Sequence, residues 1–194
     1  MITTSPVHDL DYDLARLARI VRAAPAIHDA LAWWTGYPLA AQQATEPATE
    51  ALTEADAPLL DLPAGTPVLR RTTRLISAAS SPILIAATVV ELVAEPAMRF
   101  NLAARRALRE GDQLVETLLD GLHRAAYLVT RPETRHFDDE HTAPVLIGRA
   151  VLSAAGRPVA LTTETVRRQL LTRRAPDVLP HYAARLPTPN QAAR

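Results

Sequence analysis

Two pairs of strand-like segments, each joined by a very short turn, restrict the fold of this chain more than any other feature. Residues 66–77 and 82–92 flank the turn Ala78-Ala79-Ser80-Ser81, and residues 144–154 and 157–167 flank Ala155-Gly156. Short turns join antiparallel strands, because a parallel pair needs a long crossover. The pattern therefore predicts two β-hairpins in an antiparallel sheet. Because the second strand of the first hairpin is almost wholly apolar, we expect it to be buried on nearly both faces.

Helical periodicity surrounds these hairpins. Apolar residues recur at helical spacing near the N-terminus, and Pro25 divides that stretch into helices over 10–23 and 25–35. Further along, the pattern predicts helices over 96–110 and 114–119 and a strand over 123–130. Between the first helices and the first hairpin we expect a short extended piece, 39–45, and a surface excursion, 46–63. The order predicts an α+β fold in which helices cover one face of an antiparallel sheet.

The length of 194 residues suits one domain. We predict that this domain spans residues 1–172. Residues 173–194 are rich in Arg, Pro and Ala, and we expect them to form a loose tail.

Composition excludes several functional classes. The formal net charge is zero, which argues against nucleic acid or a membrane surface as a partner. The chain has no cysteine, and all 21 basic residues are arginine. Thiolate nucleophiles, Schiff-base lysines, a pyridoxal-phosphate anchor and the phosphate-loop lysine are therefore excluded. The N-terminus lacks a signal pattern, and the longest apolar run, 83–90, is too short to span a bilayer. These features predict a cytoplasmic protein.

Two charged residues occupy strand positions that should face the core. Arg71 shares a strand face with Leu69 and Leu75, and Glu164 lies among Ala, Val, Leu and Thr. A buried unpaired guanidinium is very costly, so each residue needs a partner. One interpretation is that Arg71 and Glu164 pair with each other inside the sheet. The other is that they line one cavity, where Arg71 binds an anion and Glu164 a hydroxyl group or proton.

Other candidate sites are weaker. His136 and His141 flank carboxylates suited to metal binding, but no helix brings them together, so we interpret this stretch as a solvated loop. His28 is expected to be a packed or surface helix residue. The basic helix face formed by Arg105, Arg106 and Arg109 is expected to be solvated. No G-x-S-x-G elbow or glycine-rich nucleotide loop is present. We therefore predict neither a metal nor a cofactor.

The order of three segments resembles the chorismate pyruvate-lyase family, particularly its divergent actinobacterial branch. These segments are PVLRRTTRLISAASSPILIAATVV, GDQLVETLL and GRAVLSAAGRPVALTTETV. The resemblance covers roughly residues 60–170, and it rests on the order and spacing of the segments. It implies the family's fold, an antiparallel sheet that encloses a ligand beneath helices.

Residue roles follow from the same resemblance. Arg71 matches the arginine that binds the ring carboxylate, and Glu164 matches the glutamate that contacts the ring hydroxyl and is tied to catalysis. Leu114 matches the leucine whose backbone amide helps hold the carboxylate. Ile27 matches a residue whose backbone faces the ligand. Arg149 and Arg74 are candidates for binding the second carboxylate.

The implied activity is that of a cofactor-independent carbon–oxygen lyase. It would eliminate pyruvate from chorismate to give 4-hydroxybenzoate or a close hydroxybenzoate, by orienting a small carboxylate and moving one proton. The expected oligomeric state is a monomer or a small homo-oligomer.

Departures from the family pattern keep two alternatives open. The P-L-G helix start is replaced by Gln113-Leu114-Val115, an arginine of some relatives is Ala87, and only Arg149 remains of an arginine-rich strand. Fewer cations weaken the case for a dicarboxylate. One alternative is a cyclisation or dehydration in a secondary-metabolite pathway. The other is a non-catalytic module that binds small aryl acids, since related folds serve as effector domains of transcription regulators.

Overall fold

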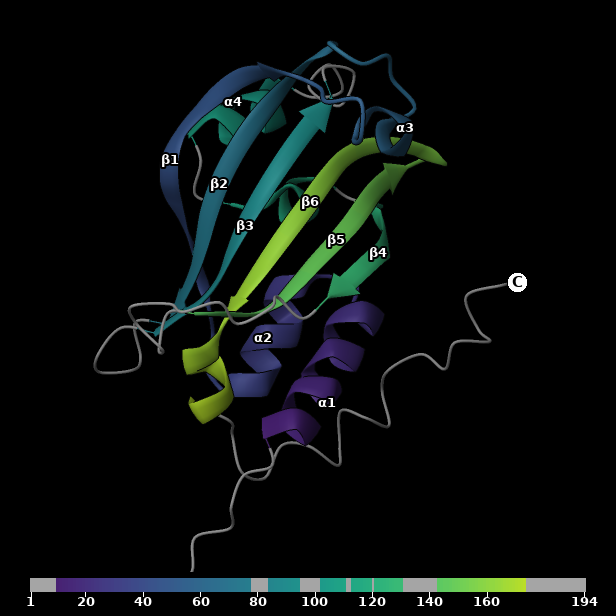
Figure 1. The fold of residues 1–194 in the computed structure, drawn as a ribbon. Helices are drawn as coiled ribbons and strands as arrows, with labels where there is room; N and C mark the ends of the chain where they lie inside the picture. Colours follow the sequence, from purple (N-terminus) through teal and green to yellow (C-terminus); the bar gives the residue numbers. More distant parts are fainter. Residues whose placement is uncertain are drawn as a thin grey trace, which may run out of the picture.

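Six strands form one antiparallel sheet in the order β1-β2-β3-β6-β5-β4 (Figure 1). The computed structural model describes residues 10–77, 84–94, 102–110, 113–119, 121–130 and 143–173. The two predicted hairpins are confirmed as β2–β3 and β5–β6, and they pair with each other through β3 and β6 at the centre of the sheet. The strands are β1 (Ala40–Ala51), β2 (Pro67–Ser77), β3 (Leu84–Ala94), β4 (His123–Thr130), β5 (Pro144–Ala154) and β6 (Arg157–Arg167).

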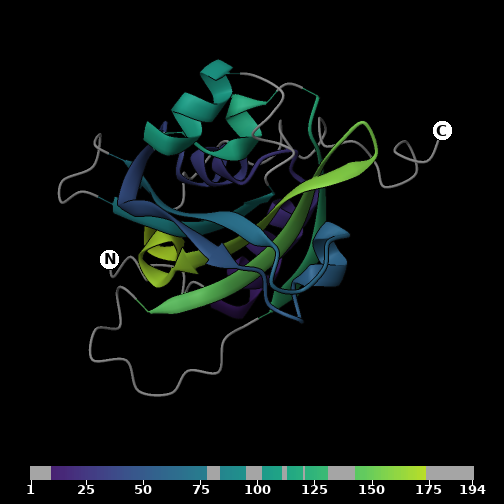
Figure 2. The same ribbon diagram turned by 90° about the horizontal axis from the view of Figure 1, so that it is seen from above.

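Helices cover one face of this sheet at both of its ends. At one end α1 and α2 pack on β2, β3, β5 and β6 through an apolar cluster that includes Leu17, Trp34 and Leu75. At the other end α4 and α5 pack through a second cluster around Leu108 and Val115. Figure 2 shows these two helices, in teal, on one side of the sheet. The helices are α1 (Leu10–Ala23), α2 (Ile27–Thr35), α3 (Ala57–Leu60), α4 (Leu102–Glu110) and α5 (Val115–Leu118), and a 3₁₀ helix, η2, spans Arg168–Arg173.

The short helix α3 packs on the opposite face of the sheet. Its Leu60 joins a third apolar cluster with Val68 and Leu161. The predicted α+β plan is therefore confirmed, with α3 as an addition on the second face.

Strand β1 differs most from the expectation. It runs through Ala51, well into the stretch predicted to be a surface excursion, and all of its residues are exposed or half-buried. Its pairing with β2 shifts register twice between Gln43 and Ala48, around Pro47, whose nitrogen cannot donate to the ladder. Backbone hydrogen bonds to β2 hold this edge strand in place. Its sequence therefore does not need the alternation of apolar and polar residues by which a strand is predicted.

Some predictions fall outside the described residues. These are the His136–His141 loop, the start of the helix predicted at 96, and nearly all of the predicted tail. Within the described part, η2 continues the chain after β6, and its Leu170 and Leu171 are buried in the cluster under α1 and α2.

Candidate functional site, a buried charged cluster

A row of polar side chains crosses the middle of the helix-covered face, between the two apolar clusters. Arg71 of β2 lies opposite Glu91 of β3, and Glu91 lies opposite Thr162 of β6. Glu164 lies on the same face of β6, two residues beyond Thr162. All four residues are buried. Each of these buried polar side chains needs hydrogen-bond partners from the protein, because bulk water does not reach it. The partners of each side chain therefore define the chemistry of the site.

Arg71 pairs with Glu91 rather than with Glu164. Its Nη1 donates to Glu91 Oε2 at 2.9 Å, and both side chains are 1% exposed. Its Nη2 donates to the backbone oxygen of Gln113 at 2.6 Å. Sequence reasoning placed Arg71 on the dry face correctly, and the partner is its register neighbour in the first hairpin.

Glu91 uses both carboxylate oxygens. Oε2 meets Arg71, and Oε1 accepts a hydrogen bond from the backbone N–H of Val115 at 2.6 Å. Burial raises the pKa of Glu91, while the Arg71 charge and the Val115 N–H oppose this rise. The carboxylate thus links β2 and β3 to the segment that opens α5.

Glu164 pairs with Arg124 of β4. Arg124 Nη2 donates to Glu164 Oε2 at 2.6 Å, and the Thr162 hydroxyl donates to Oε1 at 3.2 Å. Arg124 Nη1 also donates to the backbone oxygens of Val21 at 2.8 Å and Ala24 at 3.3 Å, near the end of α1. Burial raises the pKa of Glu164, and Arg124 opposes the rise. This second pair ties the first helix to the sheet.

Glu116 brings a third carboxylate to the cluster. Its Oε1 accepts a hydrogen bond from the backbone N–H of Ile27 at 3.0 Å, while Oε2 is buried and has no hydrogen-bond partner among the described residues. Burial and then the charge of Glu164 raise the pKa of Glu116 to about 8. The Nε atoms of Arg71 and Arg124 are also buried, and no acceptor in the described part of the chain reaches them. The cluster therefore retains unused hydrogen-bonding capacity of both kinds.

A small cavity adjoins the cluster. Its volume is about 170 Å³, and its walls combine apolar with polar side chains from α2, β1, β2 and the α5 segment. Gln113, whose carbonyl accepts from Arg71, forms part of one wall. The lining residues are His28, Leu39, Ala41, Leu75, Gln113, Leu114 and Thr117.

Leu114 and Ile27, the two predicted backbone contacts, both lie at this site. Leu114 lines the cavity, and the amide of its neighbour Val115 holds Glu91. The Ile27 amide holds Glu116. The amides of Ile27 and Val115 bind glutamates of the chain itself, and the predicted ligand contacts of Ile27 and Leu114 stay predictions.

Arg74 and Arg149 lie on the opposite face of the sheet. Arg74 is exposed, and Arg149 pairs with Asp56 just before α3. Alternation along β2 and β5 places both side chains away from Arg71. The expectation that one of them supplies a second cation to the site is therefore wrong.

Three members of the cluster were absent from the prediction. The sequence could have indicated Glu91, because a carboxylate in an apolar strand of a tight hairpin should face a residue of the partner strand. No sequence pattern indicates Arg124 and Glu116, because their partners come from strands and helices far away in the chain.

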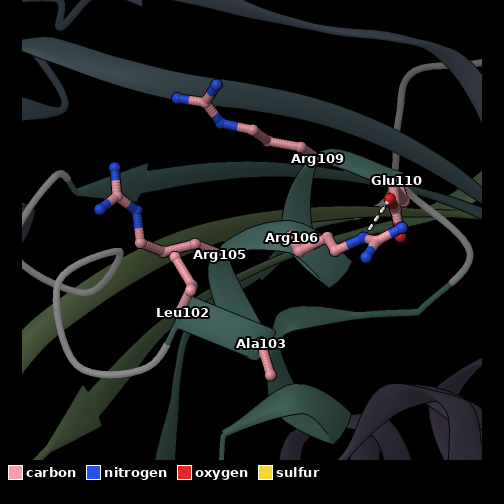
Figure 3. Close-up of a pocket in the computed structure, with 6 residues that line it drawn as sticks. All are labelled: Leu102, Ala103, Arg105, Arg106, Arg109 and Glu110. Carbon is pink, nitrogen blue, oxygen red and sulfur yellow. Dashed lines mark hydrogen bonds and ion pairs between the residues drawn. The ribbon is translucent and has the colours of Figure 1, made fainter.

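A second hollow, of about 720 Å³, is open, and its described lining residues all belong to α4 (Figure 3). Arg105 and Arg109 extend to one side of the helix, and Arg106 pairs with Glu110 at 2.6 Å on the other. The predicted solvated basic face is confirmed.

The described residues hold no group of three or more His, Asp or Glu side chains placed for a metal ion. Within those same residues, no helix is both long and apolar enough to cross a membrane.

Comparison with known proteins identifies the fold. No protein-family model and no curated protein matches the sequence. Among solved structures, the effector domain of PhnF from Mycobacterium smegmatis matches with a TM-score of 0.50 and 14% identity, over 75% of this chain and 90% of that one. The fold is the chorismate lyase-like fold. It is shared with effector domains of GntR-family regulators.

Other solved structures match less closely. A GntR-family regulator from Bacillus cereus matches with a TM-score of 0.47 and 9% identity, over 68% of this chain and 92% of that one. Complete PhnF from Mycobacterium smegmatis matches with a TM-score of 0.47 and 14% identity, over 75% of this chain and 65% of that one. A proposed GntR-family regulator matches with a TM-score of 0.47 and 13% identity, over 66% of this chain and 55% of that one. The chain thus spans 65% of complete PhnF and 55% of the last of these regulators.

Proposed function

We propose that this chain is a non-catalytic domain that binds a small single-ring molecule. The observation that carries the proposal is the pairing at the charged cluster. Arg71 and Glu164, the two groups that a lyase would use, are each engaged by a partner within the chain, Glu91 and Arg124. The cavity beside them remains available for a ligand.

The size and walls of the cavity support a ligand of one ring. An apolar protein cavity of about 150 Å³ admits benzene, and the cavity here measures about 170 Å³. Leu39, Leu75 and Leu114 supply apolar contacts, and His28 and Gln113 lie in its polar wall. Mixed walls of this kind are typical of sites for small organic molecules.

Chorismate lyase activity has less support. A ring carboxylate would have to take Arg71 from Glu91 and leave that glutamate buried without its cation, which is costly. The solved structure with the same fold at a TM-score of 0.50 is an effector domain. Binding without turnover therefore fits the observations better than pyruvate elimination.

The test combines binding with turnover. Phenol and 4-hydroxybenzamide should bind the purified chain in ligand-detected NMR and calorimetry. Ala41→Phe should weaken this binding by about tenfold or more, because the ring would fill the cavity. Ala40→Phe is the matched control, since Ala40 is the exposed neighbour of the half-buried Ala41. Incubation with chorismate should release no pyruvate.

Two results would contradict the proposal. Equal binding by the parent and Ala41→Phe, or binding of neither probe, would remove the cavity as a ligand site. Pyruvate release that disappears in Arg71→Ala would establish the lyase activity instead.

A further inference from the structure

Glu91 occupies a position that is built for an anion. One oxygen of its carboxylate meets the Arg71 guanidinium, and the other meets the backbone N–H of Val115. A cation and a backbone amide that converge on two oxygens are typical carboxylate-binding groups. Here the carboxylate belongs to the chain itself.

The pair is enclosed. Arg71 and Glu91 are each 1% exposed, and they lie directly opposite each other in the β2–β3 register. Strand pairing alone therefore brings the two side chains together. A ligand carboxylate can therefore bind Arg71 only by displacing a carboxylate that is fixed beside it.

The charge of the whole cluster also disfavours an anionic ligand. Its described members are two guanidiniums and three carboxyl groups, and each guanidinium already contacts a carboxylate. Burial and the charge of Glu164 raise the pKa of Glu116 to about 8, so this third carboxyl group adds no positive charge either. Another carboxylate would meet Glu91 and Glu164, and each described guanidinium of the cluster already has a carboxylate partner.

We propose that Glu91 is a specificity-determining residue, a built-in carboxylate that excludes carboxylate ligands and restricts the site to uncharged molecules. This inference rests on the proposed function for its ligand. It reverses the expectation that Arg71 binds the carboxylate of a small aryl acid. It also makes a prediction about Glu91 that does not depend on knowing the natural ligand.

Removing the Glu91 carboxylate should turn the position into an acetate site. Glu91→Ala deletes a CH₂ and a carboxylate group, and acetate supplies groups of nearly the same size. Arg71 and the Val115 amide would remain in place to bind it. Acetate should therefore raise the unfolding temperature of Glu91→Ala by several degrees, and it should leave the parent unchanged relative to equal sodium chloride.

Controls separate this effect from general salt stabilisation. Acetamide, the uncharged counterpart, should not replace acetate. The double variant Arg71→Ala/Glu91→Ala should lose the response, because the cation is gone. Glu50→Ala removes the carboxylate partner of Arg70 on the exposed face, so it should show no acetate response.

Benzoate extends the test to the cavity. It should bind Glu91→Ala at least tenfold more tightly than the parent, since its ring needs the adjoining space. If Glu91→Ala does not fold in chloride, refolding in acetate should restore the circular dichroism spectrum of the parent.

Several outcomes would overturn the inference. One is a folded Glu91→Ala variant whose unfolding temperature does not change with acetate. Another is an unfolded Glu91→Ala variant that does not refold in acetate. A third is an equal rise in unfolding temperature in the double variant. Tight benzoate binding by the parent would also overturn it. Failure of phenol and 4-hydroxybenzamide to bind, combined with acetate rescue of Glu91→Ala, would reject the proposed function and keep the anion position.

Discussion

Arg70 and Arg71 are consecutive residues of β2 that form ion pairs on opposite faces of the sheet. Arg70 lies 3.5 Å from Glu50 of β1, with side chains 41% and 42% exposed. Arg71 lies 2.9 Å from Glu91 of β3, with both side chains 1% exposed. The two pairs have the same chemistry, and they differ in how far water can reach them.

This difference decides what each pair contributes. Water screens the outer pair, and exposed pairs of this kind are worth about 0–1 kcal/mol. Both members of the inner pair have lost their hydration, so each depends on the other. Removing one partner of the inner pair is therefore strongly destabilising, because it leaves the other charge buried and unpaired.

Breaking the inner pair from one side should have the largest effect. Arg71→Ala should lower the free energy of unfolding by about 3–5 kcal/mol, because it leaves the Glu91 carboxylate buried without its cation. Urea denaturation followed by circular dichroism measures this loss. A change below about 1 kcal/mol would show that water reaches Glu91 readily.

Replacing both members of the pair should cost far less. Arg71→Met/Glu91→Leu removes two buried charges together, and such replacements range from neutral to about 1–4 kcal/mol more stable. The same denaturation experiment gives the value. A double variant less stable than Arg71→Ala would mean that the charges themselves hold this part of the fold.

The inner face should also make stability depend on pH. Burial and the charge of Glu164 raise the pKa of Glu116 to about 8, so the folded state keeps a proton that the unfolded state releases near pH 4.5. Stability is therefore greatest at low pH, with respect to this group, and is lost as pH rises from about 4.5 to about 8, by at most about 1.4 kcal/mol per pH unit.

Glu116→Gln should flatten this dependence, as measured by urea denaturation across the same pH range. Arg124 and Glu91 also act on Glu116, so the remaining slope reports the rest of the cluster. Glu110→Gln is the control, because Glu110 is exposed on α4. An unchanged slope in Glu116→Gln would assign the dependence to other groups.

The outer pair should give the smallest effect. Arg70→Ala should change the free energy of unfolding by less than about 1 kcal/mol. Measured beside Arg71→Ala, it isolates burial as the variable, because the two arginines are neighbours in one strand. A loss as large as that of Arg71→Ala would mean that β1 depends on this pair.

Much of the fold was predictable, because local sequence patterns indicate the strands and the turns between them. The bounds of β5 and β6 and the hairpin of β2 with β3 follow from alternation and short turns. The buried positions of Arg71 and Glu164 follow from the same alternation. The first part of β1 matches the extended piece predicted over 39–45, but its continuation to Ala51 was missed, because backbone pairing rather than side-chain burial holds this strand at the edge of the sheet.

The sequence by itself determined that Arg71 and Glu164 face a dry layer and must each have a partner, because strand alternation is a local property of the chain. Only the tertiary structure decided which partners they have. Arg124 reaches Glu164 from another strand, and Glu116 joins them from the segment above the sheet. Those contacts depend on how distant elements pack, and no spacing along the chain encodes that packing directly.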